Sequence, residues 1–382
     1  MRFKKTSYIS VIILAIWIAS FPRHVGAEVT VSAHHAVLME QISGRVLFEK
    51  NAHEKGKIAS ITKIMTAILA IESGKMDKQV TISDKAIGTE GSTLYLKNGQ
   101  KMKLRDLVYG LMLRSGNDAA VAIAEYVGGS MEGFVWLMNQ KAQEIGMENT
   151  HFSNPHGLDN TKDHYSTAYD MALLTRYAMN NEEYRKISSA KVHRASNPFE
   201  KWDYSWKNKN KMLSLYKYST GGKTGYTKLA KRTLVSTAQK GDMSLIAVTL
   251  NAPDDWDDHI TMFETAFHNY DLVEILDDDV VKKVKDSFYK NKAVLKNEFY
   301  YPLTSEEKKE IKVDYVLIQP QSKWKKGKNL PEKVGKAYIF LNGEPIGTRN
   351  IFFEPVSETF GRHFFESWRT LFFMIIGMNA DG

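Results

Sequence analysis

Ser60 and Lys63 have the residue types and spacing of a nucleophile and its base. A serine hydroxyl is a weak nucleophile at neutral pH and needs an adjacent base. At the start of a helix, residues three apart lie on one face, so Lys63 could reach the Ser60 hydroxyl. The apolar run after Lys63 predicts a buried helix, in which desolvation would lower the pKa of Lys63. A neutral Lys63 could then take the Ser60 proton, and the helix N-terminus would stabilise negative charge at Ser60.

This pair alone has a structural alternative, in which Ser60 is a buried cap and Lys63 extends its amine to solvent. Two further motifs favour catalysis. Ser115-Gly116-Asn117 and Lys223-Thr224-Gly225 follow in chain order. Together the three motifs form the S-x-x-K, S-x-N, K-T-G set of serine enzymes that acylate on penicillin or on D-Ala-D-Ala peptides.

The second motif is predicted to lie in a short link between two helices. There Ser115 could relay a proton between Lys63 and a leaving amine, and Asn117 could donate a hydrogen bond to a substrate amide carbonyl. The structural alternative is a helix break with Asp118 as the N-cap of the next helix, and both interpretations can hold.

The third motif offers groups that bind a substrate. Lys223 supplies a fixed positive charge and Thr224 a hydroxyl for a carboxylate, and the same charge would lower the pKa of Lys63 further. Gly225 lets a ligand approach the backbone closely. The motif precedes a strand pattern, and a strand edge there would hold an extended peptide by backbone pairing.

The three motifs and their surroundings resemble the low-molecular-mass penicillin-binding proteins that are serine-type D-alanyl-D-alanine carboxypeptidases of the peptidase S11 family. The segments that carry the resemblance are 56–70, 107–125, 154–159 and 219–231, and it is strongest for the sporulation-specific members from bacilli. It implies removal of the terminal D-Ala from peptidoglycan pentapeptide stems through an acyl-serine, in spore cortex or cell wall maturation. β-Lactams are then covalent inhibitors, and neither a metal nor an organic cofactor is required.

The resemblance also implies an oxyanion hole formed by main-chain N–H groups, here those of Ser60 and Tyr226. One stretch departs from the family. Some members place an arginine for the substrate's terminal carboxylate in the helix after the last sheet strands, whereas residues 254–259 are acidic here. Thr224, with Lys223 behind it, is therefore expected to bind the carboxylate.

Other hydrolase classes lack their signatures in this chain. His53-Glu54 does not continue into the H-E-x-x-H motif of zinc peptidases, and the chain has no cysteine for thiol catalysis or a cysteine-zinc site. The Glu-x-x-Leu-Asn loop of class A β-lactamases and the G-x-S-x-G elbow are also absent, so penicillin should trap Ser60 as a long-lived acyl-enzyme. Two alternatives stay open: a D,D-endopeptidase that cuts cross-links, and a catalytically silent wall-binding protein.

The order of the predicted elements indicates an α/β (α+β) fold. Two strands around Ser43-Gly44 come first, then several helices, then two strands and a closing helix. The predicted helices cover 61–73, 104–113, 118–127, 131–145, 167–180 and 256–270, and the later strands cover 232–239 and 243–251. Such an order favours an antiparallel sheet flanked by helices, which agrees with the three-layer, β-lactamase/transpeptidase-like sandwich that the resemblance implies.

The 382 residues are too many for one small domain. We expect a penicillin-binding D,D-peptidase catalytic domain over 28–272 and a small β-rich domain over 273–356, in which Asn342-Gly343 predicts a hairpin. The second domain contains none of the three motifs.

Both ends of the chain indicate an exported protein. Residues 1–27 have the basic start, short apolar core and small-residue cleavage site of a signal peptide, whose removal lowers the net charge from +8 to +4. Residues 357–382 predict an amphipathic helix with Trp368 at a membrane interface. We expect a peripheral protein on the outer face of the cytoplasmic membrane, or in the forespore envelope. Without a dense basic stripe, nucleic acid is not an expected partner.

Overall fold

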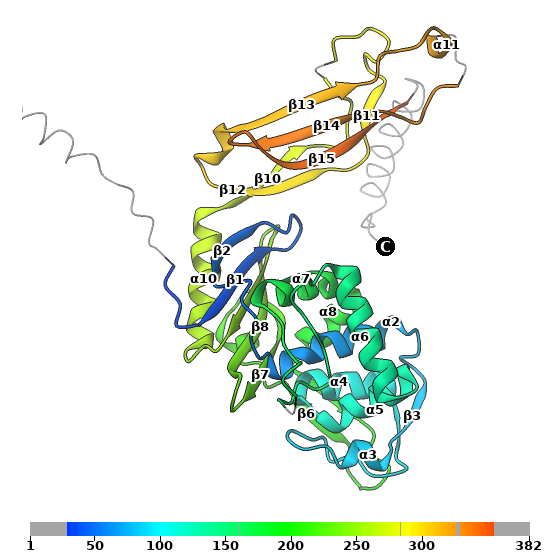
Figure 1. Cartoon of the computed structure of the whole chain (residues 1–382), viewed down its shortest axis with the longest axis vertical. Coiled ribbons are helices and arrows are strands. Elements are labelled where there is room, and N and C mark those ends of the chain that lie inside the picture. The colour runs from blue at the N-terminus through cyan, green and yellow to red at the C-terminus, as the bar shows by residue number, and fades with distance from the viewer. Residues whose placement is uncertain (1–28, 160, 283, 326–328, 355–382) are drawn as a thin grey trace, which may run out of the picture. The chain divides into compact units, whose positions relative to one another are not determined.

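The computed structural model describes residues 29–159, 161–282, 284–325 and 329–354 (Figure 1). The predicted signal peptide and the predicted amphipathic tail lie outside these ranges. Within them, every helix falls short of the length and apolar character that crossing a membrane requires.

The first part of the described chain is built on a five-stranded antiparallel sheet in the spatial order β2–β1–β9–β8–β7. The strand bounds, in this order, are Val46–Lys50, His35–Glu40, Met243–Leu250, Lys231–Lys240 and Ser219–Thr227. The predicted strands around Ser43-Gly44 form the β1–β2 hairpin, in which the Glu40 carboxylate accepts hydrogen bonds from the main-chain N–H groups of Ile42 and Ser43. β7 pairs only with β8, so one edge of this sheet is free of further strands within the described residues.

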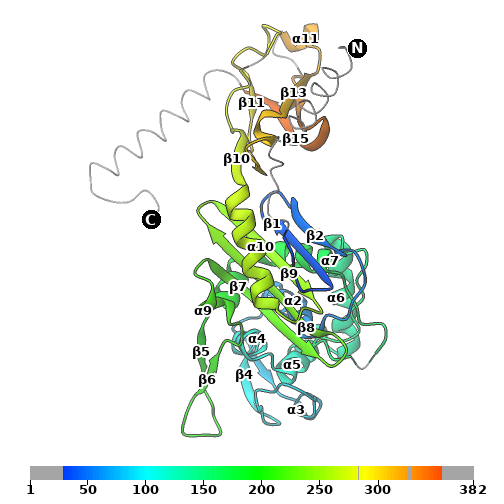
Figure 2. The ribbon, with the colours of Figure 1, turned by 90° about the vertical axis from the view of Figure 1, so that its left-hand side faces the viewer.

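Helices cover both faces of the sheet, as the sequence predicts. Helix α10 (Asp255–Asn269) packs on β8 and β9, and Figure 2 shows it along one face. On the other face, α7 (Ala168–Met179) contacts β1 and β9, and α8 (Glu182–Ser189) contacts β7. Helix, sheet and helix therefore form the three expected layers.

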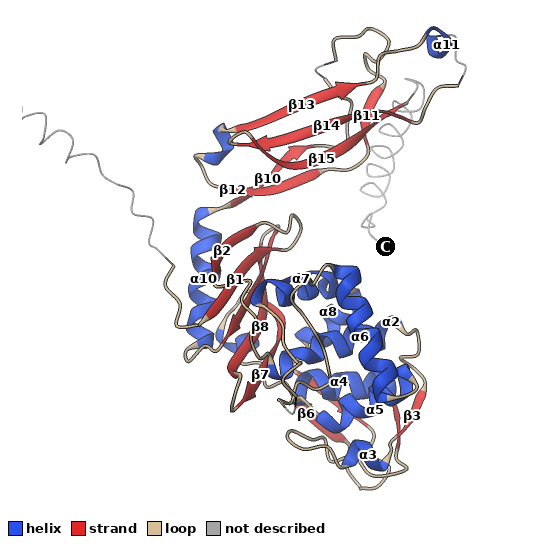
Figure 3. Ribbon diagram, viewed as in Figure 1, coloured by secondary structure: helices blue, strands red, loops and turns tan. Residues whose placement is uncertain are grey.

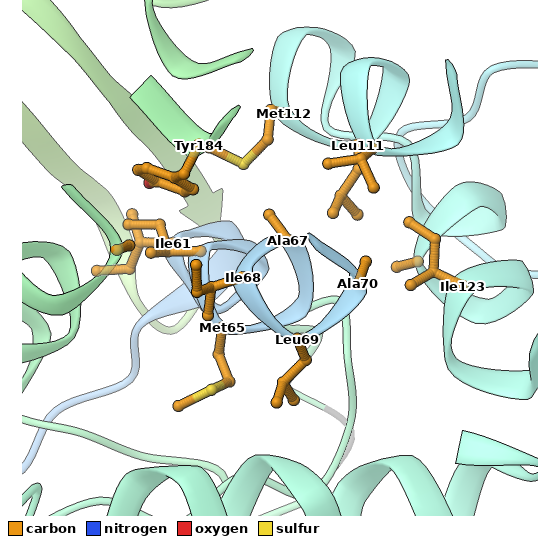
Figure 4. Close-up of a cluster of buried hydrophobic side chains, with 14 of the residues drawn as sticks. Ile61, Met65, Ala67, Ile68, Leu69, Ala70, Leu111, Met112, Ile123 and Tyr184 are labelled. Carbon is orange, nitrogen blue, oxygen red and sulfur yellow. The ribbon is translucent and has the colours of Figure 1, made fainter. Parts of the chain in front are cut away.

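The buried helix predicted after Lys63 is α2 (Lys63–Glu72), preceded by the 3-10 turn η1 (Ala59–Thr62). Every residue of α2 except Glu72 is buried. Its neighbours α4 (Leu104–Arg114), α5 (Asn117–Gly128) and α6 (Met131–Ile145) surround it. Figure 4 shows side chains of α4 and α5, and that of Tyr184, around the helix. Burial of its large apolar side chains, at about 1.5–3 kcal/mol each, fixes the helix that carries Lys63.

Several short helices and strands are not predicted by the sequence pattern. They are α3 (Asp84–Ile87), β3 (Gln79–Thr81), β4 (Lys101–Lys103), β5 (Val192–Ala195), β6 (Tyr204–Lys207) and α9 (Met212–Leu215). Each has only three or four residues, which is too short for hydrophobic periodicity to be recognised.

The region after α10 is β-rich, as expected, and Figure 3 shows that strands dominate it. One sheet pairs β10 (Asp271–Leu276) with β12 (Phe299–Leu303). The other has the order β11–β15–β14–β13, with bounds Ala293–Leu295, Glu344–Phe353, Lys333–Leu341 and Ile311–Leu317. Two short helical segments, Glu307–Lys309 and Ser322–Lys325, lie on either side of β13 in the chain.

The predicted hairpin at Asn342-Gly343 joins β14 to β15. Both turn residues have positive φ, 52° for Asn342 and 85° for Gly343, as a two-residue type I′ turn requires. Ala337, Ile339 and Ile351 are fully buried in the core of this region.

Candidate active site

The first motif forms a tight turn at the start of α2. Ser60 lies in η1, and Lys63 is the first residue of α2, so its Nζ reaches within 2.9 Å of Ser60 Oγ. The residue before the serine, Ala59, has a φ of +46°. A side chain in this left-handed region costs about 1–3 kcal/mol and persists only where the surroundings enforce it. The turn that presents Ser60 is therefore held in place by its neighbours.

Much of that support comes from the segment 154–164, whose first residues the sequence analysis noted only as a family signature. The side-chain oxygen of Asn154 accepts hydrogen bonds from the main chain of His156 and Gly157. Thr66 donates to the carbonyl of Pro155 at 2.7 Å. The hydroxyl of Thr62 lies 2.8 Å from Nε2 of the buried His164. Pro155 and His164 thus connect this segment to α2 and to the nucleophile turn.

Lys63 is completely buried, and its amine has three polar neighbours. Besides Ser60 Oγ, they are Asn117 Oδ1 at 2.7 Å and the carbonyl oxygen of His156 at 2.6 Å. Burial holds the pKa of Lys63 well below its ordinary value, and the charge of Lys223 lowers it further. These are the two physical causes that the sequence predicts for a neutral Lys63.

The second motif lies in the predicted link, where α4 ends and α5 begins. Ser115 adopts a left-handed conformation, with φ +63°, and Asn117 is the first residue of α5. One Asn117 amide hydrogen is donated to the carbonyl of Glu90 at 2.6 Å. Gly116, rather than Asp118, is the N-cap of α5. Asp118 instead accepts hydrogen bonds from the loop that precedes β4.

The third motif lies inside β7, not before a strand as the sequence indicated. Lys223 is buried in the middle of this strand, and its Nζ donates to Ser115 Oγ at 3.2 Å and to the carbonyl of Thr224 at 2.6 Å. Burial lowers the pKa of Lys223 to about 7. Its charge is therefore not fixed, because it titrates near neutral pH. Thr224 is half-buried beside it.

Gly225 allows a close approach, but to the protein's own nucleophile turn. A Cβ at this position would lie 2.8 Å from the main-chain nitrogen of Ser60 and would clash with the hydroxyl of Thr233. β7 therefore lies directly against the Ser60 main chain. Tyr226 follows on the same edge strand, with its side chain 65% exposed. This arrangement brings together all eight residues predicted for the site: Ser60, Lys63, Ser115, Asn117, Lys223, Thr224, Gly225 and Tyr226.

A pocket of about 350 Å³ opens at this point. Ser60, Ser115 and Thr224 line it, together with residues that the sequence analysis did not single out: Ser92, Lys209, Arg232, Asp255 and Trp256. Arg232 Nε donates to Asp255 at 3.0 Å, and its guanidinium lies over the Trp256 ring at 5.7 Å. The acidic stretch 254–259 thus orients an arginine that β8 supplies. Its position opposite Tyr226 in the β7–β8 register is the signal that could have identified it, had β7 been predicted.

The comparison with protein families agrees with this geometry. The family model described as D-alanyl-D-alanine carboxypeptidase matches residues 22–254, which is more than half of the chain. This protein belongs to the D-alanyl-D-alanine carboxypeptidase family. A second model, described as the C-terminal domain of penicillin-binding protein 5, matches residues 270–355 of this carboxypeptidase.

Individual relatives and solved structures agree with this assignment. The chain is 37% identical to the carboxypeptidase DacF of Bacillus subtilis over 71% of this chain and 72% of that protein. It is 34% identical to DacC of Escherichia coli over 87% of both. The crystal structure of penicillin-binding protein 5 from Haemophilus influenzae superimposes with a TM-score of 0.70 at 28% identity, covering 85% of this chain and 97% of that one.

The predicted family is therefore confirmed, as is the predicted sandwich with its β-rich second region, whereas the predicted C-terminal helix lies outside the described residues. The predicted activity is confirmed as well: this carboxypeptidase is a serine-type hydrolase of D-Ala-D-Ala peptides. It acts on peptidoglycan and binds β-lactams, as penicillin-binding proteins do.

Proposed function

We propose that Ser60 attacks the carbonyl of the penultimate D-Ala of a pentapeptide stem, with Lys63 as its base. One observation carries the assignment. The Lys63 amine has two carbonyl-type neighbours, Asn117 Oδ1 and the carbonyl of His156, and one hydroxyl neighbour, Ser60. A neutral amine has two N–H donors in this arrangement and one lone pair. The donors satisfy the two carbonyl oxygens, and the lone pair remains for the Ser60 proton.

The acylation step moves that proton to the leaving group. As the Ser60–acyl bond forms, Lys63 accepts the hydroxyl proton. Ser115, which lies beside Lys223, delivers its hydroxyl proton to the nitrogen of the departing D-alanine as the peptide C–N bond breaks, and it takes the proton held by Lys63 in return. The main-chain N–H groups of Ser60 and Tyr226 stabilise the oxyanion. Water then cleaves the ester by the reverse proton path, which regenerates Ser60 and releases the shortened stem.

Substrate binding uses the free edge of the sheet and a carboxylate site. An extended stem pairs with the β7 edge next to Ser60, because that edge has no other strand among the described residues. The terminal carboxylate is bound by Thr224 and by Arg232, which shares the pocket with it, and the charge of Lys223 behind Thr224 assists. Arg232 thus takes the role that sequence reasoning left to Thr224 and Lys223 alone. An arginine supplies the planar pair of donors that suits a carboxylate.

The experiment measures D-alanine released from a peptidoglycan pentapeptide by the wild type and by Ser60→Ala. The wild type releases one D-alanine per stem, whereas the variant, which keeps its fold by circular dichroism, releases none above background. Release by Ser60→Ala at the wild-type rate contradicts the assignment. A parallel assay on cross-linked dimers distinguishes the D,D-endopeptidase alternative, because only that activity converts dimers to monomers.

We also propose that the enzyme works outside the cytoplasmic membrane as a peripheral protein. The sequence features of 1–27 and 357–382 support this proposal. Fractionation of cells that express the chain with and without 357–382 tests it. The full chain sediments with membranes and starts at Glu28, and the shortened chain is soluble. Equal membrane association of both forms contradicts an anchor in the tail.

A role in spore cortex maturation extends the same proposal, and expression confined to vegetative growth would contradict it.

A further inference from the structure

A second pocket, of about 510 Å³, adjoins the active-site pocket. The loop that begins at Thr93 forms one wall, and the β5–β6 hairpin forms the other. Figure 2 shows this hairpin projecting next to α4. Ser92 lines the active-site pocket and the next residue, Thr93, lines the second pocket. Arg114 of the second pocket and Ser115 of the active-site pocket are likewise consecutive, so the two pockets meet at two places along the chain.

The loop wall is fixed to the second motif. Asp118, the neighbour of Asn117, accepts hydrogen bonds from Thr93 Oγ1 at 2.5 Å and from the Leu94 main chain at 2.9 Å. Leu94 is buried, and a Cβ on Gly116 would lie 2.6 Å from its Cγ. This wall is consequently a rigid extension of the catalytic frame.

Two aromatic side chains at this pocket are exposed without apolar cover. Tyr95 is 77% exposed and Trp202 is 66% exposed. Tyr95 also has a φ of +63°, a conformation that is rare for a bulky residue and tends to occur at functional sites. Exposed aromatic surface that gathers at a concave site is typical of a binding surface.

The pocket carries charges of both signs. Lys97, Arg114 and Lys207 are basic, and Glu200 and Asp203 are acidic. Among the described residues, none of these five forms an ion pair with another side chain. Free charges of both signs beside aromatic faces suit a ligand that has both an ammonium and a carboxylate, because an ammonium also binds an aromatic face.

We propose that this second pocket binds the diamino acid of a peptidoglycan stem. This residue precedes the D-Ala-D-Ala end of the stem, and its side chain ends in an amine. Glu200, Asp203 and the aromatic face of Trp202 bind the ammonium, Tyr95 contacts the methylenes, and the basic residues bind nearby stem carboxylates. The proposal rests on the proposed function. The diamino acid can come from the stem being cut or, in a cross-linked substrate, from the neighbouring stem.

The test compares two pentapeptides that differ only in whether the side-chain amine of the diamino acid is free or acetylated. The wild type cleaves the free form with a kcat/KM about fivefold higher. Trp202→Ala and Glu200→Gln remove this preference, and their kcat/KM for the acetylated form stays within about twofold of the wild type. Trp136→Ala and Glu148→Gln are the matched controls, because Trp136 is 61% exposed and both residues lie outside the pocket. A preference that survives in Trp202→Ala, or an equal loss on both substrates, excludes the stem being cut, and it overturns the proposal when the cross-linked dimer shows no loss either.

Two further arms complete the test. The first compares the cleavage rates of wild type and Trp202→Ala on a cross-linked dimer. A rate loss in Trp202→Ala that occurs only on the dimer assigns the pocket to the neighbouring stem, and a rate loss on the pentapeptide assigns it to the stem being cut. Calorimetry of Ser60→Ala with the stem tripeptide that ends in the diamino acid needs no turnover. Binding that weakens about fivefold in Ser60→Ala/Trp202→Ala supports the pocket, and unchanged binding overturns it. Failure of the proposed function alone appears separately, as absent D-alanine release with intact tripeptide binding.

Discussion

The carbonyl oxygen of Ala59 occupies the space that a side chain on Gly157 would need. Gly157 has a φ of +86°, and Ala59, which precedes the nucleophile, has a φ of +46°. Ala59 is therefore in a disfavoured conformation, and Gly157, whose φ only glycine adopts readily, lies directly against it. We expect Gly157→Ala to lower the free energy of unfolding by about 2 kcal/mol or more and to slow acylation of Ser60, because the nucleophile turn must move. Thermal unfolding and the rate of acylation by a fluorescent penicillin measure both effects.

Gly146 provides the matched control. It has the same φ of +86°, but a Cβ there would meet nothing within 4 Å. Gly146→Ala should therefore show only the backbone cost, about 1 kcal/mol, and retain the wild-type acylation rate. If both variants acylate equally fast, Gly157 does not position the turn.

Replacement of Lys63 tests the base directly. Lys63→Met removes the amine next to Ser60, so we expect the acylation rate to fall by about 10²–10⁴-fold. Lys57→Met is the control, since the Lys57 amine likewise has three oxygen neighbours, the carbonyls of residues 161, 162 and 164. That variant should lose stability but keep its acylation rate within about threefold. Comparable rate losses in the two variants would sink the assignment of Lys63 as base.

The pH profile of kcat/KM should show the ionisation of two lysines, Lys63 and Lys223. Lys63 must be neutral, and its lowered pKa means that the required form appears well below the ordinary lysine range. Lys223 must be charged to help bind a carboxylate, and its pKa is about 7. Activity should therefore rise as Lys63 loses its proton and fall as Lys223 loses its proton above about pH 7.

Lys223→Arg identifies the falling limb, because arginine keeps its charge across this range. In this variant the fall should move to much higher pH, even if the overall rate is lower. A falling limb that stays near neutrality in Lys223→Arg would have to come from another group.

Arg232 should act on the carboxylate of the substrate and on no other part of it. We expect Arg232→Ala to lower kcat/KM about tenfold for a pentapeptide with a free carboxylate, which corresponds to a charge-assisted hydrogen bond. For the same peptide with a C-terminal amide, wild type and variant should differ by less than about twofold. An equal loss on acid and amide would indicate that Arg232 only supports the fold around Asp255.

The long elements of this fold can be read from its sequence. The hydrophobic periodicity of α4, α6 and α10 and the β-branched runs of β8 and β9 predict their positions. The burial of Lys63 is also predictable, because the apolar residues after it cover most faces of the helix.

β7 could not be predicted in the same way. Its sequence, STGGKTGYT, has three glycines and little apolar side-chain area, so local propensity argues against a strand. Pairing with β8 supplies the stability instead. Because β7 was not predicted, the sequence could not show that Arg232 lies near Thr224, and the third motif was predicted to precede a strand.

The backbone conformation at the site also cannot be predicted from the sequence pattern. Ala59 and Ser115 both adopt positive φ, which neither residue type favours. Contacts from segments far along the chain impose these conformations, such as that of Gly157 with Ala59. Short helices and strands like α3 and β5 likewise depend on tertiary contacts that a single sequence does not display.

Mass spectrometry after incubation with benzylpenicillin tests the central claim, that Ser60 forms the acyl-enzyme. The wild type should gain one penicilloyl group, peptide mapping should place it on Ser60, and Ser60→Ala should gain none. The adduct should persist, because the chain lacks the deacylating glutamate loop of class A β-lactamases. A folded wild type without an adduct, or an adduct that persists in Ser60→Ala, would contradict the account.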